Sequence, residues 1–174
     1  MAAQNRNQKV KRLALMGLLF ALAMALSFLE SLLPALPMLP PGIRLGLSNI
    51  ITMYALFVLG PASGYTIAVL KSLFVLLTRG AVAAAMSAAG GIVSVTAMLL
   101  LSRLPGVKKQ YLLLSIFGGA AHNLGQLVAA RFIISNLYVW YYLPVLLVAG
   151  IVMGAITGMV LRVILPYLNR LNLK

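Results

Sequence analysis

The residues able to do chemistry are few, and most of them lie inside apolar segments. Glu30 is the only Asp or Glu among 174 residues and follows the long apolar run that opens the chain. An ionised carboxylate within a bilayer is costly, so it is usually paired with a cation and usually functional. Other apolar segments carry the possible partners and neighbours, which are Lys71, His122, Asn123, Gln126 and Arg131. These residues predict a polar pocket inside a membrane protein.

The composition excludes most other classes. Hydrophobic residues make up 63% and charged residues 9% of the chain, far outside the range of soluble domains. The net charge of +13 would indicate nucleic-acid binding if the bases formed a patch, but most of them flank apolar runs. Without Cys or Asp, thiol chemistry, an Asp-rich magnesium–diphosphate site and a Ser-His-Asp triad are impossible. No P-loop motif is present. We expect no enzyme activity, no cofactor, no metal site and no nucleic-acid partner.

Six apolar segments predict an all-α integral membrane protein with one membrane domain over residues 1–174. The expected spans cover about 13–33, 45–59, 62–78, 81–101, 111–134 and 143–165. Each is near the roughly 17 to 25 residues of a spanning helix, although the second is short. The proline-rich run Pro34–Arg44 separates the first two spans, because proline cannot continue a helix. A cleavable signal peptide is the alternative for the first segment.

The basic residues predict the orientation. Four precede the first span, three lie between the fourth and fifth spans, and three lie near the C-terminal end. In a six-span topology all of these fall on one side, which the positive-inside rule makes cytoplasmic. Both termini are therefore expected inside, in a multi-pass protein of the plasma membrane.

This orientation places the polar residues at a common depth between the midplane and the outer surface. His122 and Gln126 are four residues apart and share a helix face, which Asn123 widens. We expect an outward-facing pocket beneath a lid formed by the proline-rich run. The predicted ligand-binding residues are Glu30, Arg44, Asn49, Thr52, Lys71, His122, Asn123, Gln126 and Arg131. Their excess of cations favours a ligand that carries a carboxylate or phosphate.

A purely structural interpretation of the same residues stays open. Polar side chains at this depth also hydrogen-bond one helix to another. Glu30 with Lys71 or Arg131 would then be a structural ion pair, and His122 a core histidine. Asn49 and Thr52 would be ordinary contacts between helices.

Small residues recur every four positions in two spans. Gly17, Ala21 and Ala25 do so in the first, and Gly150, Gly154 and Gly158 in the last. Such stripes let another helix approach closely. They either pack within this chain or receive a partner protein.

Three runs carry a family resemblance: Leu29–Pro34, Gly42–Ile50 and Ala121–Leu127. They resemble the small membrane proteins labelled "Gx transporter family" and also "heptaprenyl diphosphate synthase component I". These proteins are similar to the substrate-binding S components of energy-coupling factor (ECF) transporters. The resemblance implies six helices, cytoplasmic termini, an outward pocket and a lid after the first helix. It also implies that Gly17, Ala21 and Ala25 dock on a shared transmembrane coupling subunit, which carries two ATPases.

Three functions remain open from the sequence. The first is an S subunit of an ECF-type importer, which captures a small vitamin- or precursor-like ligand, anionic or isoprenoid-related, from outside. The second is a non-catalytic membrane subunit associated with heptaprenyl diphosphate synthase. The third is a stand-alone ion-coupled carrier in which Glu30 titrates.

Overall fold

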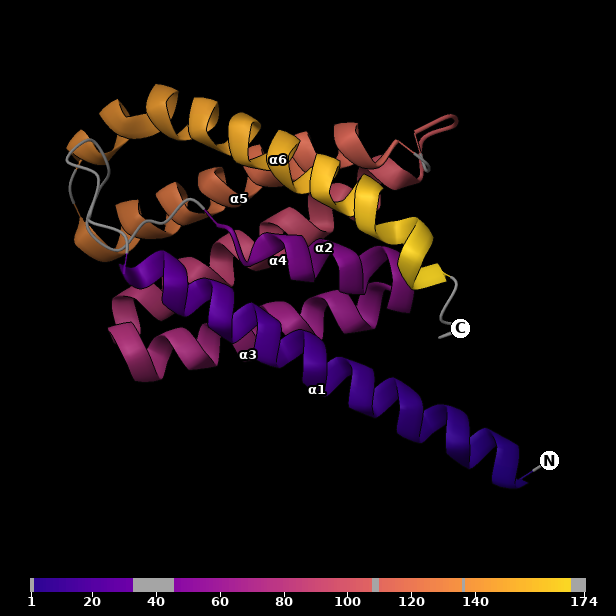
Figure 1. The fold of residues 1–174 in the computed structure, drawn as a ribbon. Helices are drawn as coiled ribbons and strands as arrows, with labels where there is room; N and C mark the ends of the chain where they lie inside the picture. The colour runs from indigo at the N-terminus through magenta and orange to yellow at the C-terminus, as the bar shows by residue number, and fades with distance from the viewer. Residues whose placement is uncertain (1, 33–45, 108–109, 136, 170–174) are drawn as a thin grey trace.

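The computed structural model describes residues 2–32, 46–107, 110–135 and 137–169. The described chain is helical almost throughout and contains no strand (Figure 1). Its elements are α1 (Ala2–Leu32), α2 (Asn49–Tyr54), the π-helical turn η1 (Ala55–Leu59), α3 (Pro61–Arg79), α4 (Ala81–Ser102), α5 (Tyr111–Ile134), the 3-10 helix η2 (Leu137–Tyr142) and α6 (Leu143–Asn169). The prediction of an all-α membrane protein is confirmed.

Five helices are long and apolar enough to cross a membrane, namely α1, α3, α4, α5 and α6. The continuous helix of α2 and η1, Asn49–Leu59, is shorter than the roughly 17 residues that a span needs. Six spans therefore remain a prediction, with the second one partly outside the described residues. The helix α1 starts at Ala2, before the expected span 13–33, and so includes the basic N-terminal segment.

Glycine and proline set the boundaries between α2, α3 and α4. Gly60 has φ +99° and Pro61 follows it as the first residue of α3, where its missing N–H costs nothing. Gly80, with φ +86°, separates α3 from α4. A positive φ suits glycine because it has no Cβ. The chain therefore turns sharply at Gly60 and again at Gly80, and α3 lies against α4.

The helices pack in an order that encloses α2. The helix α5 packs against both α4 and α6, α4 packs against α3, and α3 packs against α1. The short α2 contacts α1, α3, α4 and α6. The buried core therefore takes side chains from several helices, including Met53, Ile67, Val95 and Leu114. Large apolar side chains such as Leu13, Leu77 and Phe132 are exposed on the outside, as expected for a surface in contact with lipid.

The closest helix packing joins α5 to its neighbours through backbone contacts. A Cβ added to Gly154 of α6 would lie 2.6 Å from Ile116 Cα, and one on Gly158 would lie 2.9 Å from Leu112 Cα. On the other side of α5, a Cβ added to Gly125 would lie 3.0 Å from Gly90 Cα of α4. The stripe of small residues in α6 therefore packs within the chain. By contrast, Gly17, Ala21 and Ala25 are exposed on α1.

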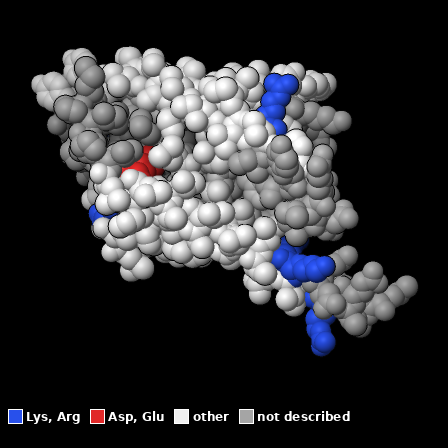
Figure 2. All heavy atoms as spheres, viewed as in Figure 1, with Lys and Arg blue, Asp and Glu red and all other residues white. Residues whose placement is uncertain are grey.

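The two ends of the bundle differ in charge. The helix α1 begins, and α6 ends, at the same end of the bundle, and the start of α1 projects beyond the other helices (Figure 1). Most basic side chains visible in Figure 2 lie toward this end, and the acidic atoms lie toward the opposite end. Arg12 of α1 fixes this end by donating a 2.9 Å hydrogen bond to the carbonyl oxygen of Leu59. The arrangement agrees with two termini on the same side of a membrane.

Candidate ligand-binding site

A pocket, called here the outer pocket, lies at the end of the bundle opposite to the start of α1. Its free volume is about 20 Å³, which is room for roughly one or two water molecules. Its lining residues are Ser27, Glu30, Gly46, Ser48, Lys71, Val75, Arg79, Ala83, Ser87, His122 and Gln126. They come from α1, the turn before α2, α3, α4 and α5. The helical lining residues thus come from the end of α1, the second half of α3, the start of α4 and the middle of α5, and the pocket lies on the side that the distribution of bases predicts to face outward.

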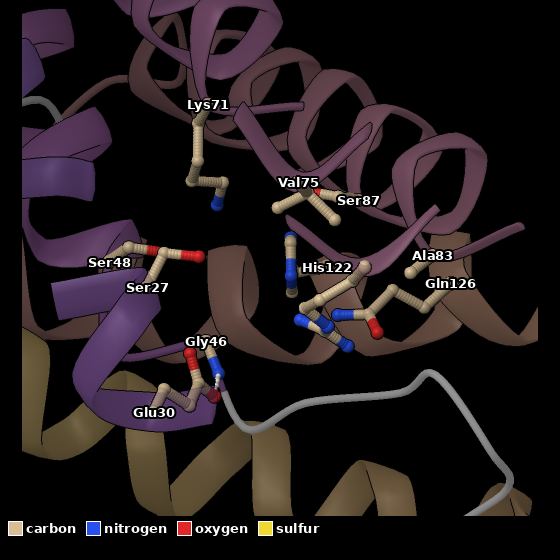
Figure 3. A pocket seen from close by; sticks show the side chains of 11 residues that line it. Ser27, Glu30, Gly46, Ser48, Lys71, Val75, Ala83, Ser87, His122 and Gln126 are labelled. Carbon is tan, nitrogen blue, oxygen red and sulfur yellow. Dashed lines mark hydrogen bonds between the residues drawn. The ribbon is translucent and has the colours of Figure 1, made fainter. Parts of the chain in front are cut away.

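Lys71 contributes a buried ammonium group to the outer pocket. Its side chain is only 3% exposed, and its Nζ donates a 2.8 Å hydrogen bond to Oδ1 of Asn49, the first residue of α2. The amine points into the space between the serines and His122 (Figure 3). A buried charge is unfavourable unless it is paired or hydrogen-bonded, so Asn49 both stabilises and orients this cation.

Glu30 holds the backbone that leads into α2. Its side chain is 4% exposed, and Oε1 accepts a 2.5 Å hydrogen bond from the backbone N–H of Gly46 (Figure 3). A hydrogen bond to an ionised carboxylate is about twice as strong as one between neutral groups. The single acid of the chain therefore joins the last turn of α1 to the turn before α2.

Gly46 occupies a position that only glycine fits. Its φ is +91°, and an added Cβ would lie 2.5 Å from Asn49 Nδ2 and 3.4 Å from His122 Cδ2. Both the backbone conformation and the space exclude a side chain. Gly46 therefore lies next to Glu30, Asn49 and His122.

His122 and Gln126 form the α5 side of the outer pocket. Both are buried, and both point toward the space that Lys71 faces (Figure 3). Gly90 of α4 makes room for the ring, since a Cβ there would lie 2.8 Å from His122 Cε1 and 2.9 Å from Gln126 Cγ. The expected i, i+4 face of α5 is thus directed at the pocket.

Asn123 turns away from the outer pocket. Its Nδ2 donates a 2.8 Å hydrogen bond to the carbonyl oxygen of Leu146 in α6, and it is not among the lining residues. Neighbouring residues on an α-helix are separated by about 100°, which places Asn123 and His122 on different faces. The structure therefore gives Asn123 a contact between helices, where the sequence predicts a pocket residue.

The remaining predicted residues lie outside the lining of the outer pocket. Thr52 is buried in α2, and its Oγ1 has no hydrogen-bond partner among the described residues. Arg131 is half-buried in the last turn of α5. Arg44 and the expected lid Pro34–Arg44 lie outside the described residues.

Asn49 separates the outer pocket from a second space, called here the inner cavity. Besides Asn49, the inner cavity is lined by Met53, Ser94, Met98, Ser115, Gly118, Gly119, Met153, Gly154 and Thr157. Its methionines are flexible and polarisable and can adapt to different shapes. The Lys71–Asn49 hydrogen bond therefore lies at the boundary between a charged compartment and a largely uncharged one.

Sequence reasoning missed Ser27, Ser48, Ser87 and Arg79. A signal for Arg79 exists, because Lys71, Val75 and Arg79 are spaced four apart and all three line the outer pocket. Ser27 likewise precedes Glu30 by one helical turn.

Lys71 and Arg79 give the pocket two cations against the single carboxylate of Glu30. With His122 neutral, the described lining residues therefore carry a net formal charge of +1.

Comparison with known sequences decides the family. Residues 19–164 match the family described as "heptaprenyl diphosphate synthase component I". The chain belongs to this family. No curated protein sequence matched the chain. The family resemblance seen in the sequence is confirmed.

A solved structure shares the fold of this family member. It is described as "Structure and mechanism of the S component of a bacterial ECF transporter", with a TM-score of 0.75 and 23% sequence identity. The match covers 92% of this chain and 98% of that one. The prediction of an S-component-like fold is confirmed, and the chain is a multi-pass membrane protein.

Proposed function

We propose that this chain is the substrate-binding S subunit of an ECF-type importer and that it captures a small anionic ligand from outside the plasma membrane. The observation that carries the proposal is the buried Lys71 ammonium, which Asn49 orients and which faces a pocket built from five segments of the chain. The S-component-like fold supports this function. The proposal includes no catalytic step.

The charges around the outer pocket favour a carboxylate or phosphate on the ligand. Lys71 and Arg79 both line it, and the carboxylate of Glu30 offsets one of them. With His122 neutral, the described lining residues carry a net formal charge of +1, which favours an anion in surroundings of low dielectric constant. His122, Gln126 and the lining serines would supply further hydrogen bonds.

The exposed stripe on α1 supports a docking role for Gly17, Ala21 and Ala25. All three are exposed, and a Cβ added to Gly17 would meet nothing within 4 Å. A helix of a partner could therefore approach the backbone of α1 closely. We assign this stripe to a transmembrane coupling subunit, with two ATPases supplying the energy for transport.

A thermal-shift screen tests ligand capture. The purified chain in detergent would be screened against carboxylates and phosphate monoesters of vitamin size. Compounds that raise the melting temperature of the wild type should not raise that of Lys71→Met. They should still raise the melting temperature of Lys9→Met, a matched control that removes an exposed base at the other end of the bundle. Equal shifts with all three proteins would contradict the outer pocket as the binding site.

The family description favours one second candidate, a membrane subunit associated with heptaprenyl diphosphate synthase. Affinity purification in mild detergent from the native host separates the two functions. An importer subunit should recover a transmembrane coupling protein and two ATPases. Recovery of a prenyl diphosphate synthase without ATPases would replace the importer with the second candidate.

A further inference from the structure

A groove distinct from the outer pocket lies between α5 and α6, near the start of α5. This α5–α6 groove has a volume of about 500 Å³ and is open to the surroundings. It is lined by Gln110, Tyr111, Leu112, Leu113, Ile116, Phe117 and Arg162. Most of the wall is apolar, and Arg162 is the one charged residue among the described residues that line it.

The contacts between α5 and α6 give the order of these residues along the membrane normal. Gly154 lies against Ile116, and Gly158 lies against Leu112, so the two helices run antiparallel. Arg162 follows Gly158 by one turn, or roughly 6 Å along the helix. The cation therefore lies nearest the end of the groove that the distribution of bases predicts to be cytoplasmic. Ile116 and Phe117 lie deeper in the apolar region.

We expect Arg162 to lie at the depth of lipid headgroups. It is one residue from the end of the apolar segment Tyr138–Val163, and its side chain is exposed. Arginine in such a position keeps its stem along apolar surface and extends its guanidinium toward the interface. The planar guanidinium matches phosphate oxygens in a bidentate geometry.

The deeper wall offers apolar surface of the kind that an acyl chain covers. Leu112 is 40% exposed and Phe117 is 51% exposed. Together with Leu113 and Ile116 they continue from the level of Arg162 toward the membrane interior. A cation at the mouth and an apolar wall below it reproduce the order of a phospholipid, with its phosphate at the surface and its chains beneath.

We propose that the α5–α6 groove binds an anionic phospholipid of the cytoplasmic leaflet. Its phosphate pairs with Arg162, and one acyl chain lies along Leu112, Leu113, Ile116 and Phe117. The groove is formed by α5 and α6, whereas the exposed stripe lies on α1, which packs mainly against α2 and α3. A lipid in the groove therefore leaves the face that we assign to the coupling subunit accessible.

Native mass spectrometry of the intact chain tests this proposal. Phosphatidylglycerol and phosphatidylcholine with identical acyl chains would be added in equal amounts to the delipidated protein. The wild type should retain phosphatidylglycerol at least about fivefold more than phosphatidylcholine. Arg162→Gln should reduce this preference below about twofold. Arg103→Gln, which removes an exposed cation of the turn after α4, should keep it. No preference in the wild type, or an unchanged preference in Arg162→Gln, would overturn the proposal.

A second variant tests the apolar part of the groove. Phe117→Ala removes an exposed ring and should lower retention of both lipids while leaving the preference for phosphatidylglycerol. Unchanged retention would overturn the acyl-chain assignment, because attraction to the headgroup alone does not depend on this ring. If Arg162→Gln instead loses a protein partner in the affinity purification and keeps its lipids, the groove is a protein interface and the lipid proposal is wrong. Thermal denaturation of each variant verifies that it is folded.

Discussion

The Lys71 ammonium and the Asn49 side chain join α3 to the first residue of α2 through a 2.8 Å hydrogen bond. Removing either partner leaves the other buried with an unused polar group, which typically costs about 1–3 kcal/mol. Replacing both with apolar residues avoids this cost. The pair therefore offers a way to separate folding from ligand binding.

We predict that Asn49→Leu and Lys71→Met each lower the melting temperature, and that the double variant recovers much of the loss. Ligand binding should stay absent in Lys71→Met and in the double variant, because both lack the cation. Thermal denaturation and binding assays on the four proteins of the cycle measure the two effects separately. A double variant that recovers binding together with stability would show that Lys71 is purely structural.

We predict that Glu30→Ala weakens ligand binding more than Glu30→Gln does. The glutamine keeps an oxygen that can accept from Gly46 N–H, although the neutral bond is weaker. Glu30→Gln should bind an anionic ligand within about threefold of the wild type, and Glu30→Ala should bind it at least tenfold more weakly. Titration of purified variants with a ligand from the screen provides the comparison. Loss of binding in Glu30→Gln alone would indicate that the negative charge itself contacts the ligand.

We predict that Gly46→Ala abolishes ligand binding. Its φ of +91° costs an L-residue about 1–2 kcal/mol, and the new Cβ would also lie 2.5 Å from Asn49 Nδ2. Gly106→Ala is the matched control, because Gly106 has φ +81° and nothing lies within 4 Å of an added Cβ. The control should lose stability but keep its ligand affinity. Equal affinities of the two variants would show that the crowding at Gly46 does not matter for the site.

We predict that His122→Ala and Asn123→Ala have different effects. His122 lines the outer pocket, so its loss should lower ligand affinity by at least tenfold with a smaller change in stability. Asn123 donates to the Leu146 carbonyl oxygen, so its loss should cost about 1–3 kcal/mol of stability and affect affinity less. Melting temperatures and ligand titrations of both variants distinguish the two roles. The reverse pattern would place Asn123, and not His122, at the ligand.

We predict that Ala21→Trp blocks assembly with the coupling subunit and leaves ligand binding intact. A bulky side chain on this exposed stripe prevents a partner helix from approaching the backbone. Leu22→Trp provides the control, since Leu22 is an exposed neighbour about 100° around the helix. Affinity purification followed by quantification of the recovered ATPases measures assembly. Normal recovery with Ala21→Trp would remove the stripe from the interface.

The sequence predicted the long helices well because their apolar length is itself the physical requirement. The α5 boundaries agree with the expected span 111–134, and α3 and α4 agree within one residue. The segment Asn49–Leu59 is harder to predict from the sequence, because its helix is shorter than a typical span and includes a π-helical turn. Packing against four other helices, which a single segment does not reveal, stabilises this short piece.

The site was predicted in part. Glu30, Lys71, His122 and Gln126 were found because polar residues in apolar helices are rare and therefore informative. The direction of Asn123 depends on the rotation of α5, which the close contacts with α4 and α6 fix. Ser27, Ser48 and Ser87 were missed because serine is common wherever membrane helices pack closely. Their roles became visible only when the neighbouring helices were in place.

The backbone contacts on both sides of α5 give the outer pocket two walls of different stiffness. The wall that carries His122 and Gln126 belongs to a helix fitted between α4 and α6 through glycines, and even a methyl group there would collide with a neighbouring backbone or side chain. The opposite wall, on α1 and the start of α2, packs less closely against its neighbours, and hydrogen bonds from Gly46 to Glu30 and from Lys71 to Asn49 join it to them. Breaking a few such bonds costs far less than separating closely packed helices. We therefore expect the α1–α2 side to move when ligands of different sizes bind. The rigid α5 side would then determine which ligands the pocket selects.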